Sequence, residues 1–383
     1  MLRFRHIIGI LIGTSVLAAL SSCSDDSEAP DSQPQSQHEL RVSMGAQRFS
    51  DVQTRNAGDL PDDFIPYDHS TALAPITQIQ GYLTFKKNRE PAYIPTIFNY
   101  NDEDGTNVWT SRIALQDDQY YLYGYMPKGV VGSDVTIEPV SNDYINGAVL
   151  TLKNLNAVSP DDICVIVGVG QYKDTPPDMS GKLGTFGFDS HAENGDNIYL
   201  LVDHIYAGMH FKMKLDETYD QLRQIKIKSM TMMPAVSTGA AVETVDAEVT
   251  LTANTAGTNP VTSVVFTNRK TSASPTPSVL YEGEGKFLST SDKEFLACLC
   301  PTTTSTGGKY ILETVYDVYD KKGGTDGKGR VIRENERAQN IISLKDALSA
   351  GQIFTVNITV QPTYLYMLSD PDLDNPTFIV NSD

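Results

Sequence analysis

Short segments in which apolar and polar residues alternate recur along most of this chain, with turn residues between them. Residues 40–44, for example, read Leu-Arg-Val-Ser-Met, so every second side chain is apolar. A period of two gives a β-strand one apolar face, whereas few stretches indicate helix, among them a helical turn at residues 219–223. Further strand-like segments lie at 79–85, 113–115, 120–125, 134–139, 148–152, 163–167, 198–202, 209–215, 225–228, 247–251, 262–267, 309–319 and 354–360. We therefore expect an all-β fold.

The length of the chain predicts two domains. Its 383 residues are about twice what one compact domain usually takes. Residues 174–197 are the best candidate for a linker, because prolines and four glycines lie there among polar residues. We expect one β-sandwich over residues 38–195, a second over 196–361, and a strand-like extension over 362–383.

The N-terminus indicates export and lipidation. Arg3 and Arg5 precede an apolar stretch over 7–20, which is shorter than the roughly 20 residues of a membrane span and resembles a secretory signal. Leu-Ser-Ser-Cys at 20–23 has the pattern of a bacterial lipobox. We therefore expect a signal peptide over 1–22 and a palmitate-bearing lipoprotein anchored at Cys23. The alternative is an ordinary signal peptide, in which this cysteine stands at the cleavage point by accident.

Residues 23–37 are predicted to be a flexible acidic tether, because they contain no apolar residue larger than alanine. The acidic residues directly after Cys23 resemble the signal that sends lipoproteins of some Gram-negative anaerobes to the outer face of the outer membrane. The chain carries 48 acidic and 30 basic residues, a net charge of −18. This charge argues against nucleic acid as a partner.

The remaining cysteines favour buried free thiols over a disulfide framework. Cys164 lies in an apolar run, and Cys298 and Cys300 are two residues apart, where a strand would place them on one face and badly for bonding each other. A Cys-x-Cys metal site is the alternative, but no nearby histidine or second cysteine pair completes it. We predict no metal site.

Motifs for catalysis are missing from the sequence. It contains no Gly-x-Ser-x-Gly elbow, phosphate loop, dinucleotide fingerprint or His-Glu-x-x-His, so we predict neither an enzyme nor a cofactor. The acidic residues at 370–374 have carboxylates at every other position, which leaves a calcium site open. They lack the glycine of a calcium loop, and the alternative is a solvated edge segment between two strands. His204 and His210 are expected to be core or surface histidines.

Several motifs together resemble one family. They are the lipobox and residues 120–127 (YYLYGYMP), 204–211 (HIYAGMHF), 222–227 (LRQIKI), 316–320 (YDVYD) and 362–366 (PTYLY). In this order the chain resembles the fimbrillin family, pilus subunits of Gram-negative gut and oral anaerobes. The resemblance implies two tandem transthyretin-like β-sandwiches and export as a lipoprotein precursor to the cell outer membrane.

The resemblance also implies a route of assembly. In the family an arginine-specific protease removes the N-terminal segment, and a C-terminal strand of a neighbouring subunit fills the groove that opens. Arg55 is the expected cleavage site and Arg48 the fallback, whereas Arg41 lies inside a predicted strand. Candidate donor-strand residues are Tyr364, Tyr366, Leu368, Phe378 and Val380, although the same residues fit two ordinary edge strands of the second sandwich.

The expected partners are other fimbrial subunits and, before maturation, the outer membrane through the lipid; the adhesion ligand is open. The position in the fibre (shaft, tip or anchor) is also open. The alternative function is a carbohydrate-binding surface lipoprotein for nutrient uptake. Trp109 and the tyrosines at 121, 123 and 125 would then stack on sugar rings, although packing between strands is the commoner use of such residues.

Overall fold

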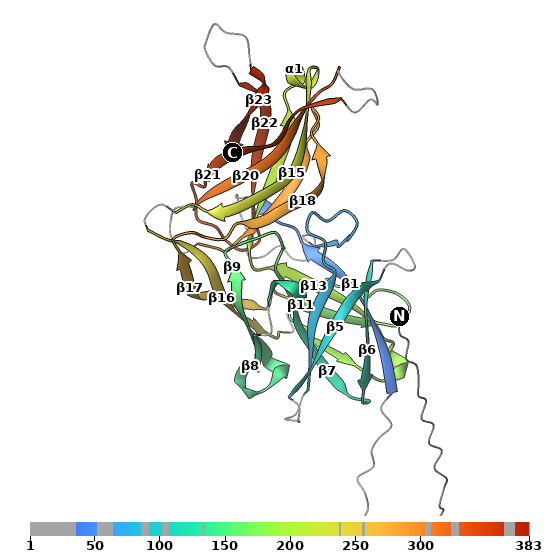
Figure 1. Ribbon diagram of the computed structural model, residues 1–383. Helices are drawn as coiled ribbons and strands as arrows, with labels where there is room; N and C mark the ends of the chain where they lie inside the picture. Colours follow the sequence, from blue (N-terminus) through green and yellow to red (C-terminus); the bar gives the residue numbers. More distant parts are fainter. Residues whose placement is uncertain are drawn as a thin grey trace, which may run out of the picture. The chain divides into compact units, whose positions relative to one another are not determined.

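Four β-sheets contain most of the described residues (Figure 1). The computed structural model describes residues 36–51, 64–85, 92–101, 107–131, 134–236, 239–254, 257–302, 308–322, 329–363 and 372–382. Within these ranges the one α-helix is α1 (Glu217–Asp220), at the predicted helical turn. No helix there is long and apolar enough to cross a membrane. The all-β class is confirmed, while the transthyretin-like arrangement of two sandwiches stays a prediction.

The largest sheet follows the order β11-β13-β1-β6-β5-β4-β7-β12, with β3 paired to β1. An additional pairing of β11 with β7 joins distant members of this order, so the path closes on itself. Its strands are β1 (Ser36–Gln47), β3 (Phe64–Pro66), β4 (Gln78–Phe85), β5 (Tyr93–Asn101), β6 (Val108–Leu115), β7 (Gln119–Met126), β11 (Cys164–Tyr172), β12 (Gly187–Asp189) and β13 (Asn197–His204). β1 is therefore an internal strand of a sheet with few open edges.

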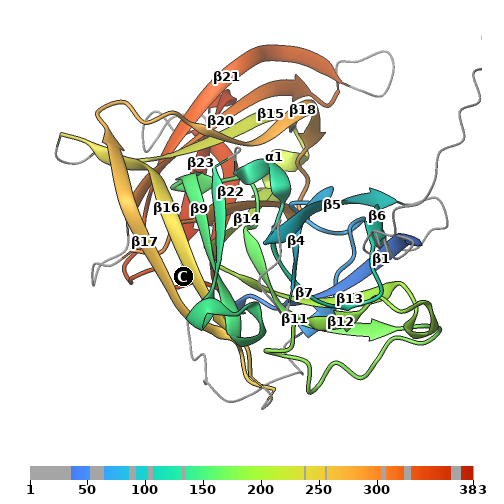
Figure 2. The same cartoon turned by 90° about the horizontal axis from the view of Figure 1, so that it is seen from below.

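A four-stranded sheet, in the order β17-β16-β9-β8, contributes to the same core. It combines β8 (Val135–Pro139) and β9 (Gly147–Asn156) with β16 (Ala241–Thr252) and β17 (Val261–Ser272). Apolar side chains from this sheet and from the nine-stranded sheet form one buried cluster, which includes Trp109. Two strands from the second half of the chain thus help to complete the first core, as Figure 2 shows for β16 beside β9.

A second core lies among the two remaining sheets. One has the order β10-β19-β14-β22-β2, with β23 also paired to β22; the other has the order β18-β15-β20-β21. Their strands are β2 (Ser50–Asp51), β10 (Val158–Ser159), β14 (Ala207–Leu215), β15 (Arg223–Pro234), β18 (Ser278–Phe287), β19 (Lys293–Leu299), β20 (Lys309–Asp320), β21 (Arg330–Ser343), β22 (Gln352–Thr363) and β23 (Asp372–Ser382). Each fully buried large apolar side chain contributes about 1.5–3 kcal/mol before ordering costs.

The expected linker over 174–197 is wrong. Leu183, Phe186 and Phe188 are at most 3% exposed and belong to the first core, and β12 within the segment pairs with β7. The prolines and glycines shape a packed segment, and its apolar residues were too widely spaced to read as a strand. β13, directly after the boundary drawn at 195, pairs with β1 and β11. The sheets therefore cross that boundary, and division into two folding domains stays a proposal.

The predicted tether ends earlier than expected. β1 begins at Ser36, two residues inside the range 23–37, and the register pairs Ser36 with Leu115 of β6. A polar strand end is stable there because a neighbouring strand supplies backbone hydrogen bonds, which composition cannot reveal. The rest of the tether lies outside the described residues.

The first four-stranded sheet contains a polar bulge. Asp246 stands where the register of β16 against β9 shifts, between Val245 and Ala247. Its carboxylate accepts a hydrogen bond from the backbone N–H of Asn154 at 2.8 Å, and Asn154 adopts a left-handed φ of 57°. The Nζ of Lys270, on β17, donates to the Asn154 side chain at 2.5 Å. Asparagine tolerates this backbone conformation, and these hydrogen bonds pair the polar groups at the bulge.

The second four-stranded sheet repeats this arrangement. Asp317 stands at a register shift of β20 against β21 and accepts from the backbone N–H of Asn335 at 2.8 Å. Asn335 has a φ of 58°, and Lys228 of β15 donates to its side chain at 2.7 Å. In both sheets the lysine, aspartate and asparagine lie on three neighbouring strands in that order. The two sheets share a local structure that no sequence repeat reveals.

Candidate functional site at the ends of strand β1

β1 is bonded along both of its edges. It runs parallel to β13, with Val42 opposite Ile198, and antiparallel to β6, with Val42 also opposite Trp109. Leu40, Val42 and Met44 are at most 2% exposed, which confirms the alternating strand expected over 40–44. This strand forms a central part of the first core.

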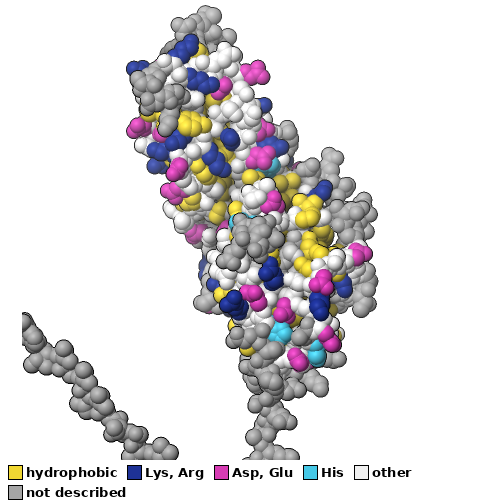
Figure 3. Space-filling model, turned by 90° about the vertical axis from the view of Figure 1, so that its right-hand side faces the viewer, with side chains coloured by type: hydrophobic (Ala, Val, Ile, Leu, Met, Phe, Trp, Pro, Cys, Tyr) yellow, Lys and Arg dark blue, Asp and Glu magenta, His cyan; other side chains and the backbone are white. Residues whose placement is uncertain are grey.

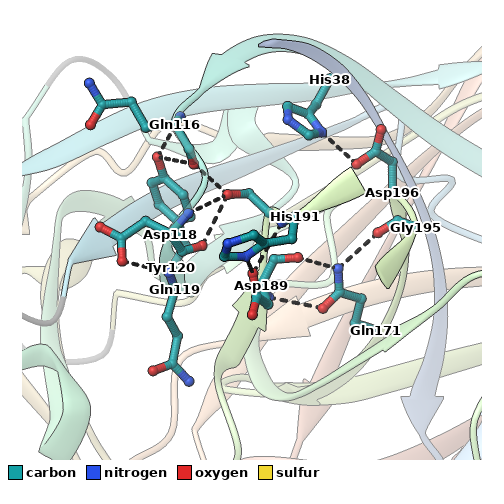
Figure 4. Close-up of polar contacts among 11 residues, drawn as sticks. His38, Gln116, Asp118, Gln119, Tyr120, Gln171, Asp189, His191, Gly195 and Asp196 are labelled. Atoms are coloured by element: carbon teal, nitrogen blue, oxygen red, sulfur yellow. Dashed lines mark hydrogen bonds and ion pairs between the residues drawn. The ribbon is translucent and has the colours of Figure 1, made fainter. Parts of the chain in front are cut away.

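A buried histidine fixes the beginning of β1. The Nδ1 of His38 lies 2.7 Å from a carboxylate oxygen of Asp196, and the His38 side chain is 4% exposed (Figure 4). Since the carboxylate can only accept, the Nδ1–H donates. Asp196 directly precedes β13, so this contact connects β1 to the segment that leads into its parallel neighbour.

A hydrogen-bond network holds the segment that carries Asp196. The side-chain amide of Gln171 donates to the carbonyls of Asp189, at 2.6 Å, and Gly195, at 2.8 Å. Its amide oxygen accepts from the backbone N–H of Asp189 at 2.9 Å (Figure 4). One side chain thus satisfies three backbone groups, so the position of Asp196 is built into the loop.

A second buried histidine fixes the end of β1. The Nε2 of His204 lies 2.7 Å from the backbone carbonyl of Gln47, the last residue of β1, and donates to it. The same imidazole ring stacks on Phe49, with ring centroids 3.8 Å apart and planes inclined by 15°. The chain on both sides of Arg48 is therefore in contact with one side chain of β13.

The other nitrogen of His204 faces two further groups. Its Nδ1 lies 2.8 Å from a carboxylate oxygen of Asp162 and 3.4 Å from the Sγ of Cys164. Burial lowers the pKa of His204, but the charges of Asp162 and Asp203 and the hydrogen bonds to the ring raise it above its ordinary value. Burial, with the same carboxylates, raises the pKa of the Cys164 thiol well above its usual range.

This group does not have the geometry of a nucleophilic triad. A triad needs the nucleophile on one imidazole nitrogen and the carboxylate on the other. Here the thiol and the carboxylate both face Nδ1, and a backbone carbonyl occupies Nε2. Cys164 is also 1% exposed, which denies it access to a substrate.

Arg48 lies between two sheets. It is exposed and follows the last residue of β1 in the nine-stranded sheet. β2 begins only two residues later and pairs in parallel with β22, Ser50 opposite Gln352. The chain at Arg48 therefore passes from one core to the other.

The C-terminal strand occupies an edge of its own chain. β23 runs antiparallel to β22, with Phe378 opposite Val360. Phe378 is 6% exposed, its ring centroid is 5.0 Å from that of Tyr316, and its carbonyl accepts from the side chain of Asn340 at 3.0 Å. Val380 packs against the second core. These two donor candidates thus lie in an edge strand of the same molecule, the alternative that the sequence left open.

β2 and β23 share one edge of β22. β14 pairs with β22 from Ile353 to Val360 and so takes one edge of that strand. β2, opposite Gln352 and Ile353, and β23, opposite residues 356–363, must both lie along the other edge. The segment after Arg48 and the end of the chain thus approach each other on a single strand.

Several predicted site residues lie outside the described part of the chain: Cys23, Arg55, Tyr364, Tyr366 and Leu368. The acidic residues at 370–374 are only partly covered, because the described residues resume at Asp372. Of the predicted site residues, the structure describes Arg48, between β1 and β2, and Phe378 and Val380, in β23; the other assignments stay predictions.

The cysteines and aromatic residues have the environments expected from the commoner alternatives. Cys164, Cys298 and Cys300 are free and buried, which confirms that prediction. Trp109 is fully buried and donates from its ring N–H to the Ile76 carbonyl at 2.9 Å. The tyrosines at 121, 123 and 125 are at most 8% exposed. The aromatic side chains proposed for stacking on sugars are therefore part of the core.

Sequence reasoning missed the group formed by Asp162, Cys164 and His204. We expected His204 to be a core or surface histidine, and its 5% exposure places it in the core, but the carboxylate that it contacts, that of Asp162, is far from it in the sequence. The register of β11 against β13 places Cys164 directly opposite His204, and Asp162 precedes the same strand. The sequence could have revealed this group only if the two apolar segments had been aligned as paired strands in the correct register.

Comparison with known proteins gives matches among solved structures only. No family model and no curated protein matches the chain. A proposed cell adhesion protein of Bacteroides fragilis is 10% identical with a TM-score of 0.46, over 90% of this chain and 98% of that one. A fimbrial protein of Bacteroides vulgatus is 12% identical with a TM-score of 0.37, over 89% and 98%.

A fimbrial anchor protein of Porphyromonas gingivalis is a further match, 10% identical with a TM-score of 0.26, over 89% of this chain and 97% of that one.

Proposed function

We propose that this chain is a structural subunit of a cell-surface fimbria, which matures by cleavage after an arginine and polymerises by strand donation. The position of β1 is the observation that supports this proposal. Removal of a strand bonded on both edges would leave unpaired backbone groups on β13 and β6. It would also open the apolar trough that Leu40 and Val42 now fill. A donated strand would satisfy both.

Cleavage has an accessible point at Arg48. This residue is exposed, it lies outside the strands, and a cut after it separates β1 from β2. Arg41, by contrast, pairs with Asn197 within the sheet, where a protease would need the strand unfolded. Arg55, our first choice from the sequence, stays a second candidate.

The donor is proposed to be the C-terminal segment with Tyr364, Tyr366, Leu368, Phe378 and Val380. β23 is bonded on one edge to β22, so its release breaks one ladder of hydrogen bonds rather than two. Burial of Phe378 contributes about 1.5–3 kcal/mol in the monomer, and a neighbour's groove must return at least as much. The groove left by β1 offers a trough of similar apolar character.

Before maturation, the lipid at Cys23 is proposed to hold the precursor on the outer face of the outer membrane. The lipobox and the acidic residues behind it support this assignment. The proposed partners are other fimbrial subunits, and adhesion is the role that such a fibre supports. On the face shown in Figure 3, basic and acidic side chains are interspersed, as is typical of a surface in contact with water.

N-terminal sequencing of fibres tests the proposal. Fibres should contain chains that begin at residue 49 or residue 56, and a chain with both Arg48→Ala and Arg55→Ala should stay monomeric. A matched Arg41→Ala chain should assemble as the unsubstituted one does, by electron microscopy of the cell surface. Fibres built from chains that begin at Cys23 would contradict the cleavage step.

A further inference from the structure

Three different metal-ligating side chains converge at one point of the first core. A carboxylate oxygen of Asp162, the Sγ of Cys164 and an imidazole nitrogen of His204 all lie within 4.8 Å of one another. Cys164 and His204 lie opposite each other on the paired strands β11 and β13, and Asp162 stands two residues ahead of Cys164. The sheet therefore sets their spacing. His204 and Asp162 have side chains 3% and 16% exposed.

The hydrogen bond at the far side of the ring leaves Nδ1 as the nitrogen that faces this point. Because a carbonyl can only accept, the Nε2 of His204 must carry the hydrogen that it donates to Gln47. Without an ion, Nδ1 also carries a proton, which it donates to the Asp162 carboxylate 2.8 Å away, so an ion must displace that proton to reach the nitrogen. Imidazoles that bind metals commonly donate the other N–H to a backbone carbonyl in this way.

The surrounding charges favour a cation at the same point. Asp203, 3% exposed, stands opposite Val165 in the register of β11 against β13 and adds a second carboxylate beside the cluster. Buried negative charges attract a divalent cation. Carboxylate, thiolate and imidazole together are ligands that suit zinc and its neighbours.

We propose that Asp162, Cys164 and His204 bind a divalent metal ion of the zinc class. The ligands are a carboxylate oxygen, the thiolate sulfur and the Nδ1 nitrogen. On binding, the thiol proton and the proton between Nδ1 and the Asp162 carboxylate pass to water, and a tetrahedral ion keeps one position for a water molecule. The partly exposed side chain of Asp162 provides the side from which an ion enters.

The ion also fixes the end of β1, an extension that rests on the proposed function. It holds the His204 ring, whose Nε2–H bonds Gln47 and whose face stacks on Phe49. These two residues flank Arg48. An occupied site therefore keeps the cleavage point on the folded surface and slows its entry into a protease.

Cobalt substitution tests the binding site. The full chain with Cys23→Ala, which removes the one cysteine outside the described residues, should bind one equivalent of Co²⁺ with a thiolate-to-cobalt charge-transfer band, and Zn²⁺ should displace it. Cys164→Ser should lose the band, and Asp162→Asn should weaken binding at least tenfold. The control Cys300→Ser, another buried free thiol, should bind normally.

A spectrum without the charge-transfer band, or one unchanged in Cys164→Ser, would overturn the metal site. If Cys164→Ser fails to fold by near-ultraviolet circular dichroism, Asp162→Asn decides the matter, because its side chain is partly exposed and its shape is conserved. Normal Co²⁺ affinity in Asp162→Asn would reject the proposed ligand set.

Limited digestion with trypsin, which needs no zinc, tests the effect on β1. Cleavage after Arg48, followed by mass spectrometry, should slow several-fold when Zn²⁺ is added, and Asp162→Asn should abolish the difference. Equal rates with and without Zn²⁺ would overturn the clamp on β1. Neither readout uses fibres, so a failure here is distinguishable from a failure of assembly.

Discussion

Strands β1 and β23 stand at opposite ends of the described chain, and the sheets hold them in different ways. β1 has a neighbour on each edge and buried histidine contacts at both ends. Among the described strands, β23 pairs with β22 alone, and it shares that edge of β22 with β2. Loss of β1 therefore opens the interior of a sheet, whereas loss of β23 returns β22 to an edge. The difference suits one strand to leave a groove and the other to be donated.

A charge in the middle of β1 should break this comparison most severely. Val42 is fully buried, so Val42→Asp places a carboxylate in the first core, at a cost of about 4 kcal/mol or more. We expect loss of the cooperative unfolding transition in urea. Glu39→Gln, an exposed position of the same strand, is the control and should unfold like the unsubstituted chain. A Val42→Asp chain with an unchanged midpoint would show that β1 is not part of the core in solution.

Truncation of Phe378 should have a smaller and more local effect. Phe378→Ala removes a ring that packs on Tyr316, which costs about 3 kcal/mol when the strand is bound. Since β23 can detach alone, we expect faster amide exchange in β23, with protection of β14 nearly unchanged.

The matched control for Phe378→Ala is Phe211→Ala, in β14, where the ring is fully buried inside the same core. It should destabilise the whole second core and accelerate exchange throughout it. Equal exchange patterns in the two variants would contradict the view that β23 is separable from the rest.

The bulge aspartate Asp246 should give an intermediate loss of stability that depends on pH. Burial raises the pKa of Asp246, but hydrogen bonds from Asn268 and Asn154 lower it further, so the carboxyl stays below its ordinary value. A lowered pKa stabilises the fold above the ordinary value, near about 4, and the contribution is lost as pH falls through the folded pKa. Asp246→Ala should cost about 2 kcal/mol at pH 7.

The measurement is the urea midpoint of the unsubstituted chain and of Asp246→Ala between pH 7 and pH 3. The gap between the two chains should narrow as the pH falls below about 4. Asp317→Ala, the counterpart in the other sheet, should also destabilise the protein at pH 7. A gap that widens on acidification would contradict the assignment of Asp246 as an ionised acceptor.

Substitution of the exposed arginine should change stability least. Arg48→Ala should shift the free energy of unfolding by no more than about 0.5 kcal/mol, because the residue lies on the surface outside the strands. It should nevertheless remove the tryptic cut between β1 and β2, as judged by mass spectrometry. If Arg48→Ala were still cut between β1 and β2, Arg48 would not be the site of this cleavage.

The strands that could be predicted were those with strict alternation or continuous apolar runs. β1, β4, β7, β14 and β22 were expected from such patterns and are present. β21 was missed because its middle reads Arg-Glu-Asn-Glu-Arg, which has no apolar periodicity, and it forms because β20 offers a complete ladder of partners. β5 and β18 were missed as well.

Prediction of the sites depended even more on which distant strands pair with each other. Local sequence was enough to identify Arg48 as a candidate cleavage site, because this needed only its position after the predicted strand at 40–44. The group of Asp162, Cys164 and His204 depends on two strands some 40 residues apart in sequence meeting in one register, which Cys164 opposite His204 establishes. No composition or spacing rule carries that information.

β21 has a consequence for selectivity. It is an edge strand of 14 residues, paired in a ladder with β20 alone in the described part of the chain, and an unpaired strand edge offers a template to an extended chain. Its charged residues are Arg330, Arg333, Glu334, Glu336 and Arg337. A side-by-side copy must bring these charges into contact or desolvate them. A protein that accepts one strand into a chosen groove thus has a reason to repel strands everywhere else.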